Sequence, residues 1–179
     1  MRKFKRKTLE TEVEVVLDSD KTEIKTDIPF LNHMLLTFSK YLGRNLIVRA
    51  KGDLRHHVIE DVALCLGRTL SEIDKKGIER FGFAIIPMDD AVTICGLDFS
   101  GRGHLIFDGE IKDGEISFSE FVHFFDTLCR NAGINAYIKV SGLDPHHVME
   151  SAFKAFAISL KTAIKKTSNE YRSAKGVLD

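Results

Sequence analysis

Two short stretches, GDLRHHVIED at residues 52–61 and GLDPHHVMES at residues 142–151, share a histidine pair followed three residues later by a glutamate. The windows 33–75 and 123–165 around them align without a gap at an offset of 90 residues and are identical at 11 of 43 positions. Three histidines, one glutamate and two glycines are among the matches, whereas core packing alone would mainly keep leucine, valine and phenylalanine. We interpret the sequence as an internal duplication that has retained ligand side chains.

The predicted elements follow the same order in both halves. Alternating polar and apolar residues predict strands at 11–18, 21–28 and 45–51, then at 91–99, 104–111 and 134–141. Helical spacing predicts helices at 30–42, 56–76, 117–132 and 146–166, and Gly43, Gly77 and Gly133 follow three of them, as is typical of helix C-termini. Each half is therefore predicted to be β-β-α-β-α, with half-repeats at 1–90 and 91–179 forming one compact unit.

The composition is that of an ordinary globular chain, with 179 residues, 44% of them hydrophobic, and a formal net charge of zero. The neutral charge argues against a nucleic-acid-binding protein, and the basic stretch RKFKRK at 2–7 is expected to be a solvated end. The absence of a long apolar run argues against a membrane span or a signal peptide. Three widely spaced cysteines in apolar surroundings are expected to be reduced core residues of a cytoplasmic protein.

Each half supplies one histidine on its first helix and a His-His-x-x-Glu element at the start of its second helix. Residues three or four apart share a helix face, so the glutamate can lie beside a histidine of the pair. Adjacent histidines lie about 100° apart around a helix and are expected to serve different ions. The predicted ligands, four for each of two ions, are His33, His56, His57, Glu60, His123, His146, His147 and Glu150. Imidazole and carboxylate together suit Mn, Fe, Co, Ni or Zn better than Ca or Mg.

The start of the last helix favours metal binding by its own geometry. Asp144 can cap this helix and Pro145 fits its first position, which leaves His146 and His147 in the first turn, where the helix dipole favours neutral imidazole. A single histidine on a helix is more often structural, and His104, which has no partner in the repeat, is interpreted in that way. The duplicated set leaves three classes open: a dinuclear metal enzyme such as a hydrolase, a metal-storing protein and a nucleic-acid-binding protein.

The chain resembles the imidazoleglycerol-phosphate dehydratases of histidine biosynthesis nearly from end to end. The resemblance is carried by RKTLET (6–11), FLNHML (30–35), HHVIED (56–61), GIERFG (77–82), PMDDAV (87–92), LDFSGR (97–102), HFF (123–125), GLDPHHVMESAFKAFA (142–157) and SAKGVL (173–178). The chain departs from the family pattern at Asn32, Tyr41, Gly103 and Ala174, and in a GDL–HH link that is three residues shorter and contains only Arg55.

The resemblance implies an α+β fold of two duplicated half-domains, with the helices packed between two sheets. It implies a hydro-lyase that converts imidazole glycerol phosphate into imidazole acetol phosphate, with two divalent ions per active site, manganese being expected. The same eight side chains would be the metal ligands, and Glu10 would contact the substrate. The implied phosphate ligands are Arg80, Arg102, Ser173 and Lys175, and the implied proton carriers are Glu10, Glu60 and Glu150. Family members form a 24-subunit shell with metal sites between subunits, so a homo-oligomer is expected.

Overall fold

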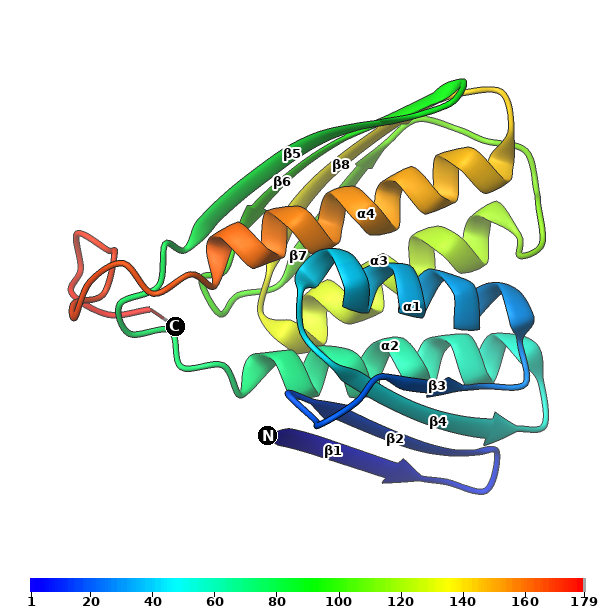
Figure 1. Ribbon diagram of the computed structural model, residues 1–179, viewed down its shortest axis with the longest axis horizontal. Coiled ribbons are helices and arrows are strands. Elements are labelled where there is room, and N and C mark those ends of the chain that lie inside the picture. The colour runs from blue at the N-terminus through cyan, green and yellow to red at the C-terminus, as the bar shows by residue number, and fades with distance from the viewer. Residues whose placement is uncertain (179) are drawn as a thin grey trace.

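The structure is a computed structural model that describes residues 1–178. Two four-stranded sheets form its outer layers and four helices lie between them (Figure 1). The elements are β1 (Arg2–Lys7), β2 (Thr11–Leu17), β3 (Glu23–Lys25), α1 (Pro29–Leu42), β4 (Leu46–Gly52), α2 (Arg55–Ser71), β5 (Phe81–Met88), β6 (Ala91–Asp98), β7 (His104–Asp108), α3 (Phe118–Ala132), β8 (Asn135–Ser141) and α4 (Pro145–Ala163). The expected α+β fold with helices between two sheets is confirmed.

The two sheets have the same topology. Their strand orders are β1-β2-β4-β3 and β5-β6-β8-β7, and in each sheet only the last pair is parallel. In the central pairs Val15 lies opposite Val48, and Cys95 lies opposite Ile138. All four of these side chains are buried toward the helices, as the alternation of faces along a strand requires.

Helix α2 packs against α3, and α1 packs against α4. All four helices begin at the same end of the molecule (Figure 1). Aromatic rings fill the space between them: Phe125 contacts Phe121, Phe153 and Phe156 at centroid distances of 5.0–5.3 Å. Such edge and tilted contacts are the favoured arrangement of buried rings. Because the helices start together, side chains in their first turns gather at one end of the fold.

Strands β1 and β5 were not predicted. Each half is therefore β-β-β-α-β-α, and the predicted β-β-α-β-α order is wrong in this respect. Strand β1 occupies the basic stretch that was expected to be a solvated end; its only apolar residue is Phe4, so it carries no alternating signal. Strand β5 has an inverted pattern, with Phe81 and Phe83 outside and Gly82 inside. Gly82 is needed there because a Cβ atom would collide with the Ser159 carbonyl of α4.

Element ends also differ from the prediction. Helix α2 ends at Ser71 and not at residue 76, and Gly77 lies in a later turn with φ of 74°. Strands β3 and β7 are shorter than the predicted 21–28 and 104–111. The division of the chain after residue 90 remains a prediction; by its pairing with β6, β5 belongs to the second sheet.

The outer faces of the two sheets differ sharply. The first is covered by alternating charges from Lys3, Lys5, Glu14 and Arg49. The second exposes large apolar side chains, namely Phe81, Phe83, Ile85, Ile94 and Ile106, of which Phe83 is 80% exposed. An apolar patch of this kind on an outer face is typical of an interaction surface. None of the helices within residues 1–178 has the length and apolar character needed to cross a membrane.

The charged face gives a prediction about stability. Hydrogen bonds from Lys3 and Lys5 lower the pKa of Glu14 to about 2. A lowered carboxyl pKa stabilises the fold above the unfolded value and loses this effect as pH falls toward the folded value. In metal-free protein Glu14→Gln should therefore cost about 1 kcal/mol at pH 6, a figure reduced because the lysines are about half exposed. The cost should shrink steadily toward pH 3 in urea unfolding; a cost independent of pH would contradict this.

Candidate metal centre

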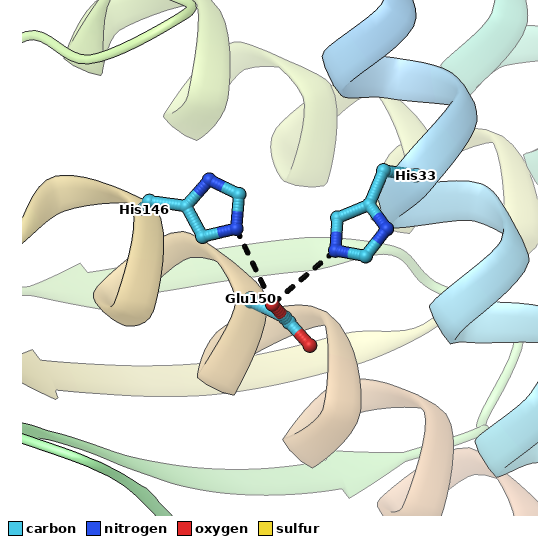
Figure 2. Close-up of side chains that lie close together, drawn as sticks. All are labelled: His33, His146 and Glu150. Atoms are coloured by element: carbon cyan, nitrogen blue, oxygen red, sulfur yellow. Dashed lines mark hydrogen bonds and ion pairs between the residues drawn. The ribbon is translucent and has the colours of Figure 1, made fainter.

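His33, His146 and Glu150 come together between α1 and α4, with one ligand atom of each within 4.8 Å of the others (Figure 2). Glu150 Oε2 lies 3.3 Å from His33 Nε2 and 3.4 Å from His146 Nε2. Pro29 begins α1 one turn before His33, and the Asp144 carboxylate caps α4 by accepting from the His146 backbone N–H at 2.8 Å. The helix starts thus place two imidazoles and one carboxylate around a common point.

Glu150 is held as a carboxylate. Its residue is only 8% exposed, and Lys154 Nζ donates to Oε1 at 2.9 Å, which leaves Oε2 toward the histidines. Burial raises the pKa of Glu150, but hydrogen bonds from Lys154 and His33 outweigh it, so the pKa lies below its ordinary value. Lys154 itself stacks over the Tyr41 ring at 5.5 Å. An ionised, positioned carboxylate beside two imidazoles is a suitable donor set for a transition metal.

A second, looser group involves α2 and α3. His123 Nε2 lies 3.5 Å from Glu60 Oε2, so here a histidine of the second half faces a glutamate of the first. The rings of His56 and His57 pack with their centroids 4.2 Å apart. The His56 ring makes no hydrogen bond within residues 1–178, whereas the His57 ring does. No third ligand atom joins His123 and Glu60 in the part of the chain described. The structure therefore brings together three of the eight predicted ligands in one group and two in another.

The other three predicted ligands, His56, His57 and His147, lie outside these two groups, and His57 and His147 contact aspartates. His57 Nδ1 lies 2.8 Å from Asp53, and His147 Nδ1 lies 2.5 Å from Asp90. These hydrogen bonds raise the pKa of each histidine above its ordinary value, against a smaller opposing effect of burial. An aspartate on Nδ1 fixes the ring and directs Nε2 outward, as is common for metal-bound histidines. Glu10 lies nearby, 3.9 Å from His57 Nδ1.

The predicted phosphate ligands lie at the opposite end of α4. Arg80 and Arg102 both reach Asp98, at 2.7 Å and 3.7 Å, and Arg80 also donates to the backbone oxygen of Arg172 in the tail. The tail forms a turn in which the Ser173 hydroxyl accepts from the Lys175 backbone N–H. The Arg80 backbone N–H donates to the Ala163 carbonyl at the end of α4. That carbonyl is 13 residues, or about 20 Å, from Glu150 along the helix.

A family model for imidazoleglycerol-phosphate dehydratase matches residues 26–160. The enzyme of that name from Archaeoglobus fulgidus is 63% identical over 179 residues, covering all of both chains. The chain belongs to the imidazoleglycerol-phosphate dehydratase family. The dehydratase of Methanosphaerula palustris is 44% identical over 97% of this chain and 96% of its own. The Pyrococcus furiosus enzyme, solved in complex with (S)-C348, superposes with a TM-score of 0.91 at 39% identity, covering 98% of this chain and 100% of that one.

The dehydratase function in histidine biosynthesis expected from the resemblance is thereby confirmed. The structure of the dehydratase also identifies side chains that sequence reasoning did not single out. Asp53 and Asp90 orient histidines, Lys154 holds Glu150, and the Glu115 carboxylate accepts from His146 Nδ1 at 2.7 Å. Lys154 had a visible signal, because Glu and Lys four residues apart on a helix commonly pair. Glu115 lies in an irregular segment and had none.

Proposed function

We propose that this dehydratase removes water from imidazole glycerol phosphate to give imidazole acetol phosphate, and that its histidine–glutamate groups bind the metal ions of the active site. The observation that carries the proposal is the group of His33, His146 and Glu150, in which a buried, ionised carboxylate faces two imidazole nitrogens. A solvent-exposed cluster of acids would be less informative, because such clusters are common on protein surfaces.

The donor set fits two divalent ions per active site, with manganese as the proposed metal. The proposed ligands are the eight predicted ones: His33, His56, His57, Glu60, His123, His146, His147 and Glu150. Carboxylate oxygens favour Mn²⁺ and imidazoles tolerate it, whereas no thiolate is available because all three cysteines are buried in the core. When bound, such ions would supply Lewis acidity that eases loss of a proton from the imidazole ring of the substrate.

The active site is proposed to form between copies of the chain. Within one chain, Glu150 of the metal-binding group and Ala163, which contacts the phosphate-binding residue Arg80, are about 20 Å apart along α4. The three-carbon chain that joins the ring to the phosphate in the substrate is too short to span this distance. His57 and His147 contact aspartates and not the glutamate of either histidine–glutamate group. A homo-oligomer, with a 24-subunit shell as the expected form, would bring one chain's metal ligands to another's phosphate ligands.

The apolar outer face of the second sheet supports association of this kind. Phe83 and Ile85 are 80% and 62% exposed there, on a strand whose small residues face inward. Covering such side chains with another copy would remove a large apolar area from water. The unpaired, buried cysteines are consistent with a reducing compartment, and we propose the cytoplasm as the location.

The carboxylates are proposed to divide between ligand and proton carrier. Glu150 has one oxygen on Lys154 and the other toward the histidines, which suits a ligand and leaves little freedom to move a proton. The Glu10 side chain is 61% exposed in the β1–β2 turn beside His57, so it can approach a bound substrate and exchange protons with water. Glu60, at 48% exposure, is an intermediate case.

Lys175 should act on substrate affinity. Its side chain is exposed in the tail turn next to Ser173, and it would add a positive charge at the phosphate. Lys175→Ala should raise KM about tenfold with kcat nearly unchanged, because a hydrogen bond to a charged group contributes about 1.5 kcal/mol or more. Steady-state kinetics with Lys165→Ala, another exposed lysine, as the control checks this. An unchanged KM would remove Lys175 from the phosphate site.

The proposed reaction is tested by incubating manganese-loaded protein with imidazole glycerol phosphate and identifying the product by mass. Formation of imidazole acetol phosphate is expected. Release of inorganic phosphate in its place would indicate a metal-dependent hydrolase, and no turnover by a fully metal-loaded, assembled protein would contradict the proposal.

A further inference from the structure

The segment between β7 and α3 carries a glutamate that reaches the metal-binding group. Glu115 Oε1 lies 2.7 Å from His146 Nδ1, and the opposite ring nitrogen, Nε2, faces Glu150. A carboxylate on Nδ1 fixes the tautomer and the direction of the ring, so that Nε2 presents its lone pair to a metal. Phe30 and His33 lie against the same ring at 5.7 Å each, so Glu115 supplies the polar restraint on a ring already packed between neighbours.

Arg55, from the other half of the chain, holds this segment in place. Its guanidinium donates to both oxygens of Glu120, at 3.0 Å and 2.8 Å, and more weakly to the Glu115 carbonyl at 3.4 Å. Glu120 in turn accepts from the Ser117 backbone N–H at 2.8 Å and so completes the capping box of α3. A bidentate arginine–carboxylate contact fixes the relative orientation of the two side chains as well as pairing their charges. Arg55 therefore links the start of α2, next to His56, to the segment that carries Glu115.

Within residues 1–178, a carboxylate contacts the first histidine of the His-His pair in one half only. The first half joins β3 to α1 through residues 26–28, whereas the second half joins β7 to α3 through the longer segment 109–117, which contains Glu115. In keeping with this, His56, the counterpart of His146, has no carboxylate on its ring within residues 1–178. The two histidine–glutamate groups thus differ in how firmly their rings are oriented.

We propose that Glu115 is a positioning residue for His146 and that Arg55 keeps Glu115 in register, which makes the His33–His146–Glu150 group the tighter of the two metal-binding groups. The inference rests on the proposed metal centre. It concerns orientation and not stability: the Glu115 side chain is 47% exposed, and exposed ion pairs contribute little to folding. A purely structural ion pair would change the melting temperature slightly and leave the metal affinity unaltered.

The experiment measures Mn²⁺ affinity directly, by titrating metal-free protein with Mn²⁺ and following the free ion by electron paramagnetic resonance. Glu115→Ala should weaken the tighter binding step about 10–100-fold, the usual effect of removing a partner of a metal-bound histidine. Glu115→Gln keeps an oxygen that can accept from Nδ1, so it should recover part of the lost affinity. Glu110→Gln, an exposed glutamate of the same segment, is the matched control and should bind as the unaltered protein does.

Arg55→Met should weaken the same step less than Glu115→Ala, because Glu115 keeps its carboxylate but loses its support. Arg68→Met, an exposed arginine of the same helix, is its control. Unchanged Mn²⁺ affinity in Glu115→Ala would overturn the inference if His146→Ala abolishes the step. If His146→Ala also binds Mn²⁺ normally, the metal centre itself is wrong and the proposed function fails with it. Thermal unfolding of each metal-free variant shows whether a change in affinity arises from a change in fold.

Discussion

Replacing Glu150 with glutamine is expected to remove both the bound metal and the activity, with kcat/KM falling by more than about 100-fold. Loss of a side chain that only orients a ligand already costs 10–100-fold, so loss of a ligand should cost more. Glutamine keeps the shape of the side chain but removes the charge that Lys154 and the two histidines share. The measurement is metal content by mass spectrometry together with kcat/KM on the same preparation.

The control for this variant is Glu170→Gln, an exposed glutamate of the C-terminal tail, which should keep full metal content and activity. Because Glu150 is buried, a stability measurement on the metal-free protein accompanies the kinetics. If Glu150→Gln retains its metal and its activity, the group of His33, His146 and Glu150 is not the metal site.

Mixing two inactive variants should restore activity, because the active site is proposed to combine residues of different copies. One variant, Glu150→Gln, lacks metal ligation; the other, Arg102→Ala with Lys175→Ala, lacks the phosphate contacts. Each alone should be at least about 100-fold less active. When the two are dissociated by metal removal, mixed and reassembled with Mn²⁺, some sites receive intact metal ligands from one copy and intact phosphate ligands from another. A readily measured part of the original activity should return.

The control is a simple mixture of the two variants, each assembled beforehand and not dissociated. This mixture should stay inactive, whereas the reassembled mixture should regain activity. A differently tagged copy of each variant, captured through one tag, shows that mixed assemblies form. If mixed assemblies form and are no more active than either variant alone, the metal ligands and the phosphate-binding residues of an active site come from the same chain. That result would conflict with the separation of about 20 Å along α4.

Much of the fold followed from local patterns. Gly43 and Gly133 end α1 and α3 in left-handed conformations, as the sequence predicted. Strands β1 and β5 could not be predicted in this way. The residues on their outer faces depend on what covers each sheet, and not on packing against the chain's own core. β1 lies on a charged face and β5 on an apolar one, and neither shows the usual alternation.

The candidate site was predictable in its residues but not in its partners. The repeat identified the histidines and glutamates, yet His33 faces Glu150 and His123 faces Glu60, each across the two halves. That pairing depends on α1 packing against α4 and α2 against α3, which no spacing along the chain specifies. Glu115 illustrates the same limit, since its approach to His146 depends on Arg55, 60 residues away from it in sequence.

The central claim is that the dehydratase requires metal bound by the histidine–glutamate groups. It is tested most directly by measuring metal content and loss of imidazole glycerol phosphate in one sample, before chelation, after chelation and after Mn²⁺ is restored. Activity should fall with the metal to background and return with it, and Glu150→Gln should not respond to added Mn²⁺. Full activity in protein shown to be free of metal would contradict the account.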